Sequence, residues 1–452
     1  MMSGREKHPA SGGGAQAGSV AEPGPGGRLR GAVSSLLRIP LYQSASALVL
    51  TTGANAGLGL VYWTLAARLF TTEEVGRGAA SVAALQLVSM LGCTGLTPAL
   101  IRFIPASRAG TRRLVQGTYL AGVSLALLCG AGVLVASELF IEALAVPGFI
   151  YLAAVVVWAL FTLQDGALIG LRREVWVPAE NALYGVAKII LLLALSTGGA
   201  WAIFVSWSLS AVLLVVPVNL ALFLKFIPAH ARAERGERNE FSPGEIGRFS
   251  GANHVSGLLM AAPDFLMPIM VLEIEGATDN AFFYAAWSLV WPLRLIANNI
   301  ANAFTAHAAD DESGARDLWV KAGLLMVAIF VPLVLILTLG SNPLLRLLFG
   351  REYASSGDLV MVLLAPGLLP YAFVSLGVAM ARVRRQMVRL LVLSAAYALV
   401  SLPLSIALIS GIGIEGAGLA WLLSQFVVAG IALVLWSLHL LERRGRLDLT
   451  AD

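Results

Sequence analysis

Long apolar segments separated by short polar connections run along most of the chain. Each segment holds about 20 or more mostly apolar residues, and a helix of that length crosses the roughly 30 Å hydrocarbon layer of a membrane. The segments cover residues 41–69, 76–101, 114–137, 148–171, 178–197, 200–224, 249–272, 280–306, 319–340, 357–381, 390–410 and 413–438. This pattern predicts an all-α, multi-pass membrane protein with about twelve transmembrane helices.

The composition supports the same class. Apolar residues make up 58% of the sequence and charged residues 13%, against about half and about a quarter in a soluble domain. A soluble protein of this length would lack the polar groups to cover its surface. The polar connections are also too short to form a separate domain outside the membrane.

The longest polar connection divides the predicted spans into six and six. We therefore expect an N-terminal six-helix bundle over residues 39–226, a cytoplasmic linker over 227–248 and a C-terminal six-helix bundle over 249–440. Residues 1–38 are rich in Gly, Ala, Ser and Pro, which predicts a disordered cytoplasmic tail. Residues 441–452 are expected to form a second cytoplasmic tail.

Basic residues predict the orientation of these spans. With the N-terminal tail inside, 25 of the 31 Lys and Arg residues fall on the inner side, four fall in outer loops, and Lys188 and Arg294 lie within spans. Such a bias is typical of cytoplasmic loops, so both termini are expected in the cytoplasm. The net charge of +4 is thus explained by the Lys and Arg residues of the cytoplasmic loops. No nucleic-acid partner is expected.

Metal and redox chemistry find no support in the sequence. The two cysteines, Cys93 and Cys129, both lie inside apolar segments, and the five histidines are scattered. None of the spacings that place two metal ligands on one helix face occurs. We therefore expect no metal and no cofactor.

Polar side chains inside the eighth segment are the strongest functional signal. Arg294 lies about fourteen residues from either end, or roughly 20 Å deep, so it must be solvated inside the protein. Asn298 and Asn302 follow at four-residue steps, which places all three side chains on one helix face. We expect this face to line a hydrophilic cavity. Alternatively, the Asn residues join helices by hydrogen bonds.

Two further polar stripes occur in the seventh and first segments. Asn253 and Asp264 belong to the former and Asn55 to the latter. Asp264 is the expected partner that neutralises Arg294. Asp165 and Lys188, in the fourth and fifth segments, lie at depths that allow them to pair. Either Asp165 and Lys188 form a structural salt bridge, or they take part in ion coupling.

Four short sequences resemble a known family. They are ARLFTTEEVG at residues 67–76, QDGALIGLRR at 164–173, LFGREY at 348–353 and GIGIEGAGLA at 411–420. They resemble the O-antigen and oligosaccharide-lipid flippases, which are polysaccharide-biosynthesis proteins of the multidrug/oligosaccharidyl-lipid/polysaccharide exporter superfamily. The resemblance implies two six-helix bundles around a central V-shaped cavity.

The resemblance also implies a function. Such proteins are not enzymes: they move polyprenyl-diphosphate-linked oligosaccharides across the bacterial cytoplasmic (inner) membrane, for cell-surface polysaccharides such as lipopolysaccharide. Transport would proceed by alternating access. Arg294 would bind the diphosphate, and the sugar would be bound by Asn298, Asn302, Asn253 and Asn55. The coupling ion, H⁺ or Na⁺, would use Asp264, with Asp165 and Lys188 as further candidates. A glycan polymerase is the expected protein partner.

Two alternatives have their own sequence features. A cation-coupled multidrug antiporter of the same fold would use Asp165 and Asp264, the central acids. A membrane glycosyltransferase or glycan polymerase would use Glu73 and Glu74 as a catalytic pair, but the outer loops are too short to bind an acceptor. Acidic residues at that position are also typical of a helix N-terminus. Thr278 and Asp279 precede the eighth segment similarly, which indicates either a repeat or two similar helix caps.

Overall fold

The computed structural model describes residues 40–140, 147–233, 242–310, 314–384 and 386–448. The expected N-terminal tail and part of the expected linker lie outside these residues. Every regular element in the described part of the chain is helical. The all-α prediction is confirmed.

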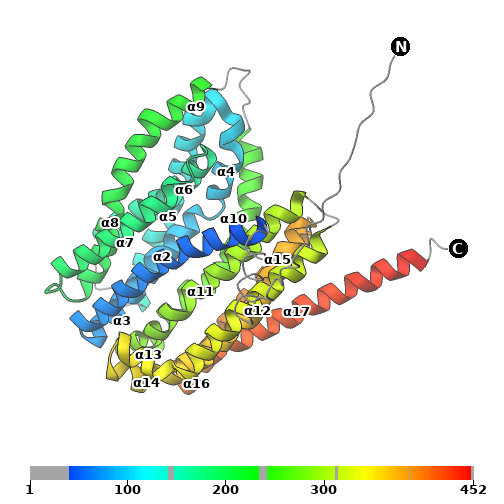
Figure 1. Ribbon diagram of the computed structural model, residues 1–452. Helices are drawn as coiled ribbons and strands as arrows, with labels where there is room; N and C mark the ends of the chain where they lie inside the picture. Colours follow the sequence, from blue (N-terminus) through cyan, green and yellow to red (C-terminus); the bar gives the residue numbers. More distant parts are fainter. Residues whose placement is uncertain (1–39, 141–146, 234–241, 311–313, 385, 449–452) are drawn as a thin grey trace, which may run out of the picture.

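The first half of the chain forms the helices shown in blue to green in Figure 1. They are α2 (Pro40–Leu69), α3 (Thr72–Cys93), α4 (Leu96–Ser107), α5 (Thr111–Phe140), α6 (Gly148–Gly170), α7 (Trp176–Ala194), α8 (Ala200–Ala221) and α9 (Ile227–Ala233). A π-helical turn over Leu222–Phe226 joins α8 to α9. Helix α4 continues α3 after a break at Thr94 and Gly95.

The second half forms the helices shown in green to red. They are α10 (Pro243–Glu275), α11 (Ala277–Asp310), α12 (Ala315–Leu339), α13 (Ser341–Leu348), α14 (Arg351–Leu364), α15 (Leu368–Val383), α16 (Met387–Ile412) and α17 (Ile414–Asp448). A 3₁₀ turn over Ala365–Gly367 joins α14 to α15. In the described residues, ten helical segments are long and apolar enough to cross a membrane. Helices α2 and α11, of 30 and 34 residues, are also long enough to cross a membrane, so the described helices agree with about twelve passes.

Helices extend into the expected linker from both sides. The α8–α9 helix continues to Ala233, and α10 begins at Pro243. Ser242 caps α10, because its Oγ accepts a hydrogen bond from the backbone N–H of Glu245 at 3.1 Å. Only residues 234–241 of the connection lie outside the described chain.

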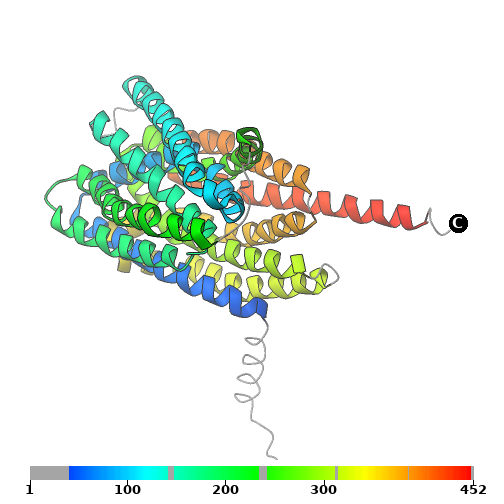
Figure 2. The same ribbon diagram turned by 90° about the horizontal axis from the view of Figure 1, so that it is seen from above.

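The two bundles meet at one end and diverge at the other. We call the end where α2 begins and α17 ends the proximal end, and the opposite end, which carries α13, the distal end. In Figure 1, α8 and α9 rise away from α12 and α17 toward the proximal end. Figure 2 shows the same arrangement from above, with α17 extending beyond the other helices.

Small residues allow the bundles to touch at the distal end. A Cβ atom added at Gly76 of α3 would lie 1.7 Å from the carbonyl oxygen of Ala277, so α3 and α11 cross with backbones in contact. Arg68 reaches from the end of α2 to the carbonyl oxygen of Leu347 at 2.8 Å. The distal end is therefore closed between the bundles.

Helix α10 also contacts the first bundle toward the proximal end. The Phe249 ring lies 5.6 Å from the Phe103 ring, and the guanidinium of Arg102 lies 4.6 Å above it. The backbone N–H of Gly95 donates to Nδ1 of His254 at 3.3 Å. Helix α10 therefore stays in contact with the first bundle at this end, although α8 and α9 diverge from α12 and α17.

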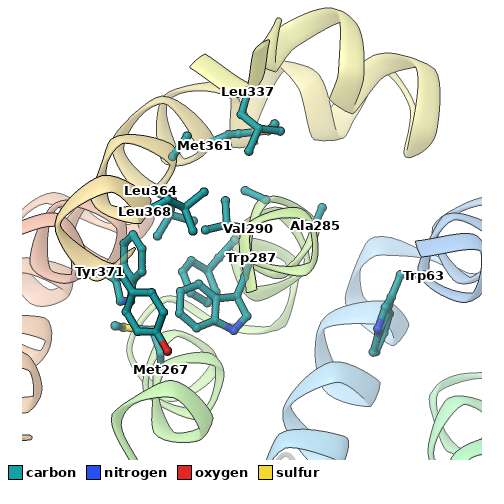
Figure 3. Packing of buried hydrophobic residues seen from close by; sticks show 14 of the residues in the cluster. Trp63, Met267, Ala285, Trp287, Val290, Leu337, Met361, Leu364, Leu368 and Tyr371 are labelled. Carbon is teal, nitrogen blue, oxygen red and sulfur yellow. The ribbon is translucent and has the colours of Figure 1, made fainter. Parts of the chain in front are cut away.

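One large apolar cluster connects the bundles. It includes buried residues of α2, α3, α7 and α8 together with residues of α10, α11, α14, α15 and α17. Figure 3 shows part of it, with Trp287 beside Val290 and Trp63 on another helix. A second cluster lies within α3–α9 and holds the first bundle together.

Candidate functional site

A polar cavity of about 550 Å³ lies among α10, α11, α15, α16 and α17, with Thr94 and Pro98 of the first bundle at its wall. Its polar lining side chains are Thr94, Asn253, Ser256, Asp264, Arg294, Asn298, Asn302, Tyr371, Ser375, Arg382, Tyr397 and Gln425. The predicted stripes of the seventh and eighth spans therefore face one cavity. We call it the polar cavity.

A buried ion pair forms the inner wall of the polar cavity. Nη1 of Arg294 lies 2.6 Å from Oδ2 of Asp264, and both side chains are less than a tenth exposed. The hydroxyl of Tyr397 donates to the other carboxylate oxygen of Asp264 at 2.6 Å. The Arg294 guanidinium also lies 4.3 Å from the centre of the Tyr371 ring. Asp264 is thus the partner of Arg294, as expected.

Asn298 is held one turn further along α11. Its Oδ1 accepts hydrogen bonds from the Tyr371 hydroxyl at 3.1 Å and from Oγ of Ser375 at 3.3 Å. These contacts fix the amide in the cavity wall. Asn302, the next residue on this face, and Arg382 at the end of α15 are both exposed. The cavity is therefore accessible toward the proximal end.

Asn253 lies on the opposite wall, near the start of α10. Its Nδ2 donates to the carbonyl oxygen of Phe249, one turn earlier, at 2.9 Å, and its side chain is half-buried. Ser256 faces the same cavity and makes a hydrogen bond with Ser394 of α16 at 3.2 Å. Among the described residues, no hydrogen bond to the side-chain oxygen of Asn253 is observed, so this oxygen can accept one from a ligand.

A second, smaller cavity of about 270 Å³ adjoins the polar cavity, and both are lined by Asp264 and Trp291. Its aromatic lining residues are Trp63, Trp207, Phe265, Tyr284, Trp287 and Trp291, and its polar ones include Asn55, Gln86, Lys188 and Ser288. We call it the aromatic chamber. Asn55 therefore lies in this chamber and not with the other predicted Asn residues.

Lys188 of α7 is enclosed by aromatic rings. Its Nζ lies 4.2 Å from the ring centre of Trp207, 5.0 Å from that of Tyr62 and 5.2 Å from that of Tyr184. The side chain is 6% exposed. Within the described part of the chain, it forms no ion pair with Asp165, so the predicted pairing is not observed.

Asp165 lies instead beside a carboxyl group that the sequence reasoning missed. Oδ1 of Asp165 and Oε1 of Glu180 are both buried and have no hydrogen-bond partner among the described residues. Gln164 donates from Nε2 to Oε2 of Glu180 at 3.5 Å and accepts from Nδ2 of Asn219 at 2.7 Å. Two carboxyl groups that are buried side by side disfavour a second negative charge, so the pair is suited to hold a proton.

Glu73 and Glu74 do not form a free acidic pair. Glu74 and Thr71 make reciprocal hydrogen bonds that cap α3, and Glu73 forms an ion pair with Arg77 at 2.8 Å. These contacts are typical of a helix N-terminus. The cap interpretation is confirmed.

A family model for polysaccharide biosynthesis proteins matches residues 41–309, which is more than half of the chain. The protein belongs to the polysaccharide biosynthesis protein family. The match covers α2 to α11, and therefore includes Asp264, Arg294 and all lining residues of the aromatic chamber, but not Tyr371, Arg382 or Tyr397. No curated protein sequence matches this member of the family.

Solved structures share the fold at low sequence identity. An inward-facing multidrug resistance MATE family transporter of the MOP superfamily is 17% identical, with a TM-score of 0.62 over 89% of this chain and 97% of that one. A MOP superfamily transporter from Pyrococcus furiosus is 15% identical, with a TM-score of 0.63 over the same shares. The lipid II flippase MurJ in an inward closed conformation is 12% identical, with a TM-score of 0.62 over 86% of this chain and 87% of that one.

Proposed function

We propose that this polysaccharide biosynthesis protein is a flippase, which moves a polyprenyl-diphosphate-linked oligosaccharide across the bacterial inner membrane by alternating access. The observation that carries the proposal is a polar, basic cavity enclosed by apolar helices and accessible from one end. A glycan headgroup fits such a cavity while its lipid tail stays in the bilayer. Family membership supports a glycan as cargo.

The residues at the cavity mouth suggest where the substrate first binds. Arg382 is exposed there, and its guanidinium would receive the diphosphate by charge-assisted hydrogen bonds. Asn302, Asn298 and Asn253 present amide groups to sugar hydroxyls along the path inward. Arg294 lies deeper, where the diphosphate would compete with Asp264 for its guanidinium.

The proposed orientation places the proximal end in the cytoplasm. The excess of Lys and Arg on that side supports this assignment. The state described here would then receive substrate from the cytoplasm, because the distal end is closed by the contacts of Gly76 and Arg68. Divergence of the bundles at the distal end would release the glycan outside, where a polymerase would use it.

We propose a proton as the coupling ion, held by Asp165 and Glu180. Asp264 is less suited to this role, because both of its carboxylate oxygens are occupied by Arg294 and Tyr397. The Asp165–Glu180 pair has buried carboxyl oxygens without a hydrogen-bond partner in the described residues, and it lies outside the polar cavity. A proton could therefore enter or leave it without displacing the substrate.

The ion pair between Arg294 and Asp264 also favours a flippase over a drug antiporter. A cationic drug needs an unneutralised carboxylate inside the membrane, and Arg294 neutralises Asp264. The polar cavity adds Arg382 as a further positive charge. Such a cavity favours an anionic headgroup.

The proposal is tested with purified protein in liposomes that contain a fluorescent lipid-diphosphate oligosaccharide. Arg382→Gln is expected to slow flipping by about tenfold or more, because one charge-assisted contact contributes roughly 1.5–3 kcal/mol. Arg112→Gln, on an exposed position of α5, is the matched control and keeps the wild-type rate. Equal rates for all three proteins would contradict the binding path, and absence of flipping by the wild type would contradict the function.

A further inference from the structure

Lys188 has an incomplete environment for a charged group. Its side chain is 6% exposed inside the membrane domain. Among the described residues, no carboxylate forms an ion pair with it. Charged side chains at membrane depth normally face a partner or a polar cavity. The side chain of Lys188 lines the aromatic chamber, so the missing partner would be found there.

The rings around Lys188 hold the ammonium without neutralising it. The ring centres of Trp207, Tyr62 and Tyr184 all lie within about 5 Å of Nζ, and cation–π attraction favours the ammonium form in this apolar setting. The hydroxyl of Tyr62 is fixed by Ser206 of α8 at 2.8 Å. The ammonium is thus positioned before any ligand arrives.

The remaining walls of the chamber combine flat apolar surfaces with hydrogen-bonding groups. Trp63 and Tyr284 pack at 4.5 Å between ring centres, and Trp287 and Trp291 lie on the α11 side. Asn55 also lines the chamber, and its side-chain amide can form hydrogen bonds with a ligand. A sugar ring has an apolar face of C–H groups and a rim of hydroxyls, so it matches both kinds of surface.

The size of the chamber limits what it holds. Its volume of about 270 Å³ is below the roughly 300–1,000 Å³ of pockets for drug-sized ligands. A single sugar ring is therefore favoured over a chain of several. Asp264 also lines the chamber, but its charge is neutralised by Arg294, so it does not repel an anion at this position.

We propose that the aromatic chamber binds one sugar ring that carries a carboxylate, with Lys188 as the counter-ion. The inference rests on the proposed flippase function and names the class of glycan. A carboxylate fits better than a phosphate, because one ammonium faces the ligand and the Arg side chains for a diphosphate lie in the polar cavity. The rest of the headgroup would lie in that adjoining cavity.

The test compares two lipid-diphosphate disaccharides that differ only at the second sugar, which is glucuronic acid in one and glucose in the other. Wild-type protein is expected to flip the acidic substrate about tenfold faster at low concentration, as one charge-assisted contact predicts. Lys188→Gln is expected to bring the ratio of the two rates close to one. Lys225→Gln, an exposed lysine beyond α8, is the matched control and keeps the wild-type ratio.

A binding measurement separates this inference from the flippase proposal. Methyl glucuronide is expected to quench the tryptophan fluorescence of detergent-purified wild type saturably, and methyl glucoside about tenfold more weakly. Lys188→Gln should remove that difference. Equal binding or equal flipping of the acidic and neutral sugars by the wild type would overturn the inference. Failure to flip either lipid, together with selective binding of the glucuronide, would overturn the flippase proposal alone.

Discussion

The side-chain amide of Asn280 donates a hydrogen bond of 2.8 Å to the backbone carbonyl oxygen of Gly76, and so joins the first turns of α11 and α3. Asn280 is fully buried at this contact. The two residues are the first of the second and eighth predicted spans, where the two similar sequences lead into their helices. Whether these sequences arose as a repeat or as two helix caps, their helices meet each other and close the distal end.

A larger side chain at Gly76 is expected to open this contact. Gly76→Val places Cβ where the Ala277 carbonyl oxygen lies, and overpacking of this kind costs about 1–3 kcal/mol. The ratio of the distally closed to the distally open state should fall by about fivefold or more. Slower flipping should accompany this shift, because substrate binds the closed state from the proximal end.

Spin labels at Glu73→Cys and Glu352→Cys, with Cys93 and Cys129 replaced by Ser, measure the separation of the two bundles at the distal end. The distance distribution should lengthen in the Gly76→Val protein. Gly117→Val is the control, because a Cβ at that helical glycine meets open space. An unchanged distribution in Gly76→Val would show that this contact does not set the distal closure.

The ion pair between Arg294 and Asp264 predicts strong coupling between the two residues. Asp264→Asn leaves the buried guanidinium unpaired and is expected to lower the free energy of unfolding by about 3–5 kcal/mol. Arg294→Gln in the same protein should restore part of that loss. Unfolding in detergent of the two single variants and the double variant measures the coupling. Strictly additive losses would mean that the pair contributes no interaction energy.

The helices were predictable because their cause is local. Each span needs about 20 apolar residues, and this condition is visible in the sequence alone. The placement of Arg294, Asn298 and Asn302 on one cavity wall followed from the helical period for the same reason. Asp264 was a predictable partner because its span is the neighbouring one and it lies at a similar depth.

The aromatic chamber and the acidic pair were not predictable in this way. Tryptophans at helical spacing look alike whether they line a cavity or a core. Glu180 lies close to the start of its span, and its partner becomes visible only when α6 and α7 are packed. This packing also explains why Asp165 does not pair with Lys188. Asp165 lies beside Glu180, and Lys188 is eight residues further along α7, or about 12 Å along the helix.

Glu180→Gln is expected to uncouple flipping from the proton gradient. A gradient of one pH unit, acidic outside, supplies about 1.4 kcal/mol per proton and should accelerate wild-type flipping by up to about tenfold. The variant should keep the same rate with and without the gradient, because Asp165 then has no neighbouring carboxyl group that favours its protonation. The exposed Glu352→Gln is the control. Full acceleration in Glu180→Gln would assign the proton to another group.

The most direct test of the central claim is the accessibility of a fluorescent lipid-diphosphate oligosaccharide to an external reagent in proteoliposomes. The account predicts that wild-type protein exposes the inner-leaflet headgroups and that Arg294→Ala, reconstituted at equal amount, largely fails to do so. Full flipping by Arg294→Ala would contradict the role given to the polar cavity. No flipping by the wild type under any ion gradient, with transport of toxic cations instead, would contradict the flippase and establish a drug antiporter.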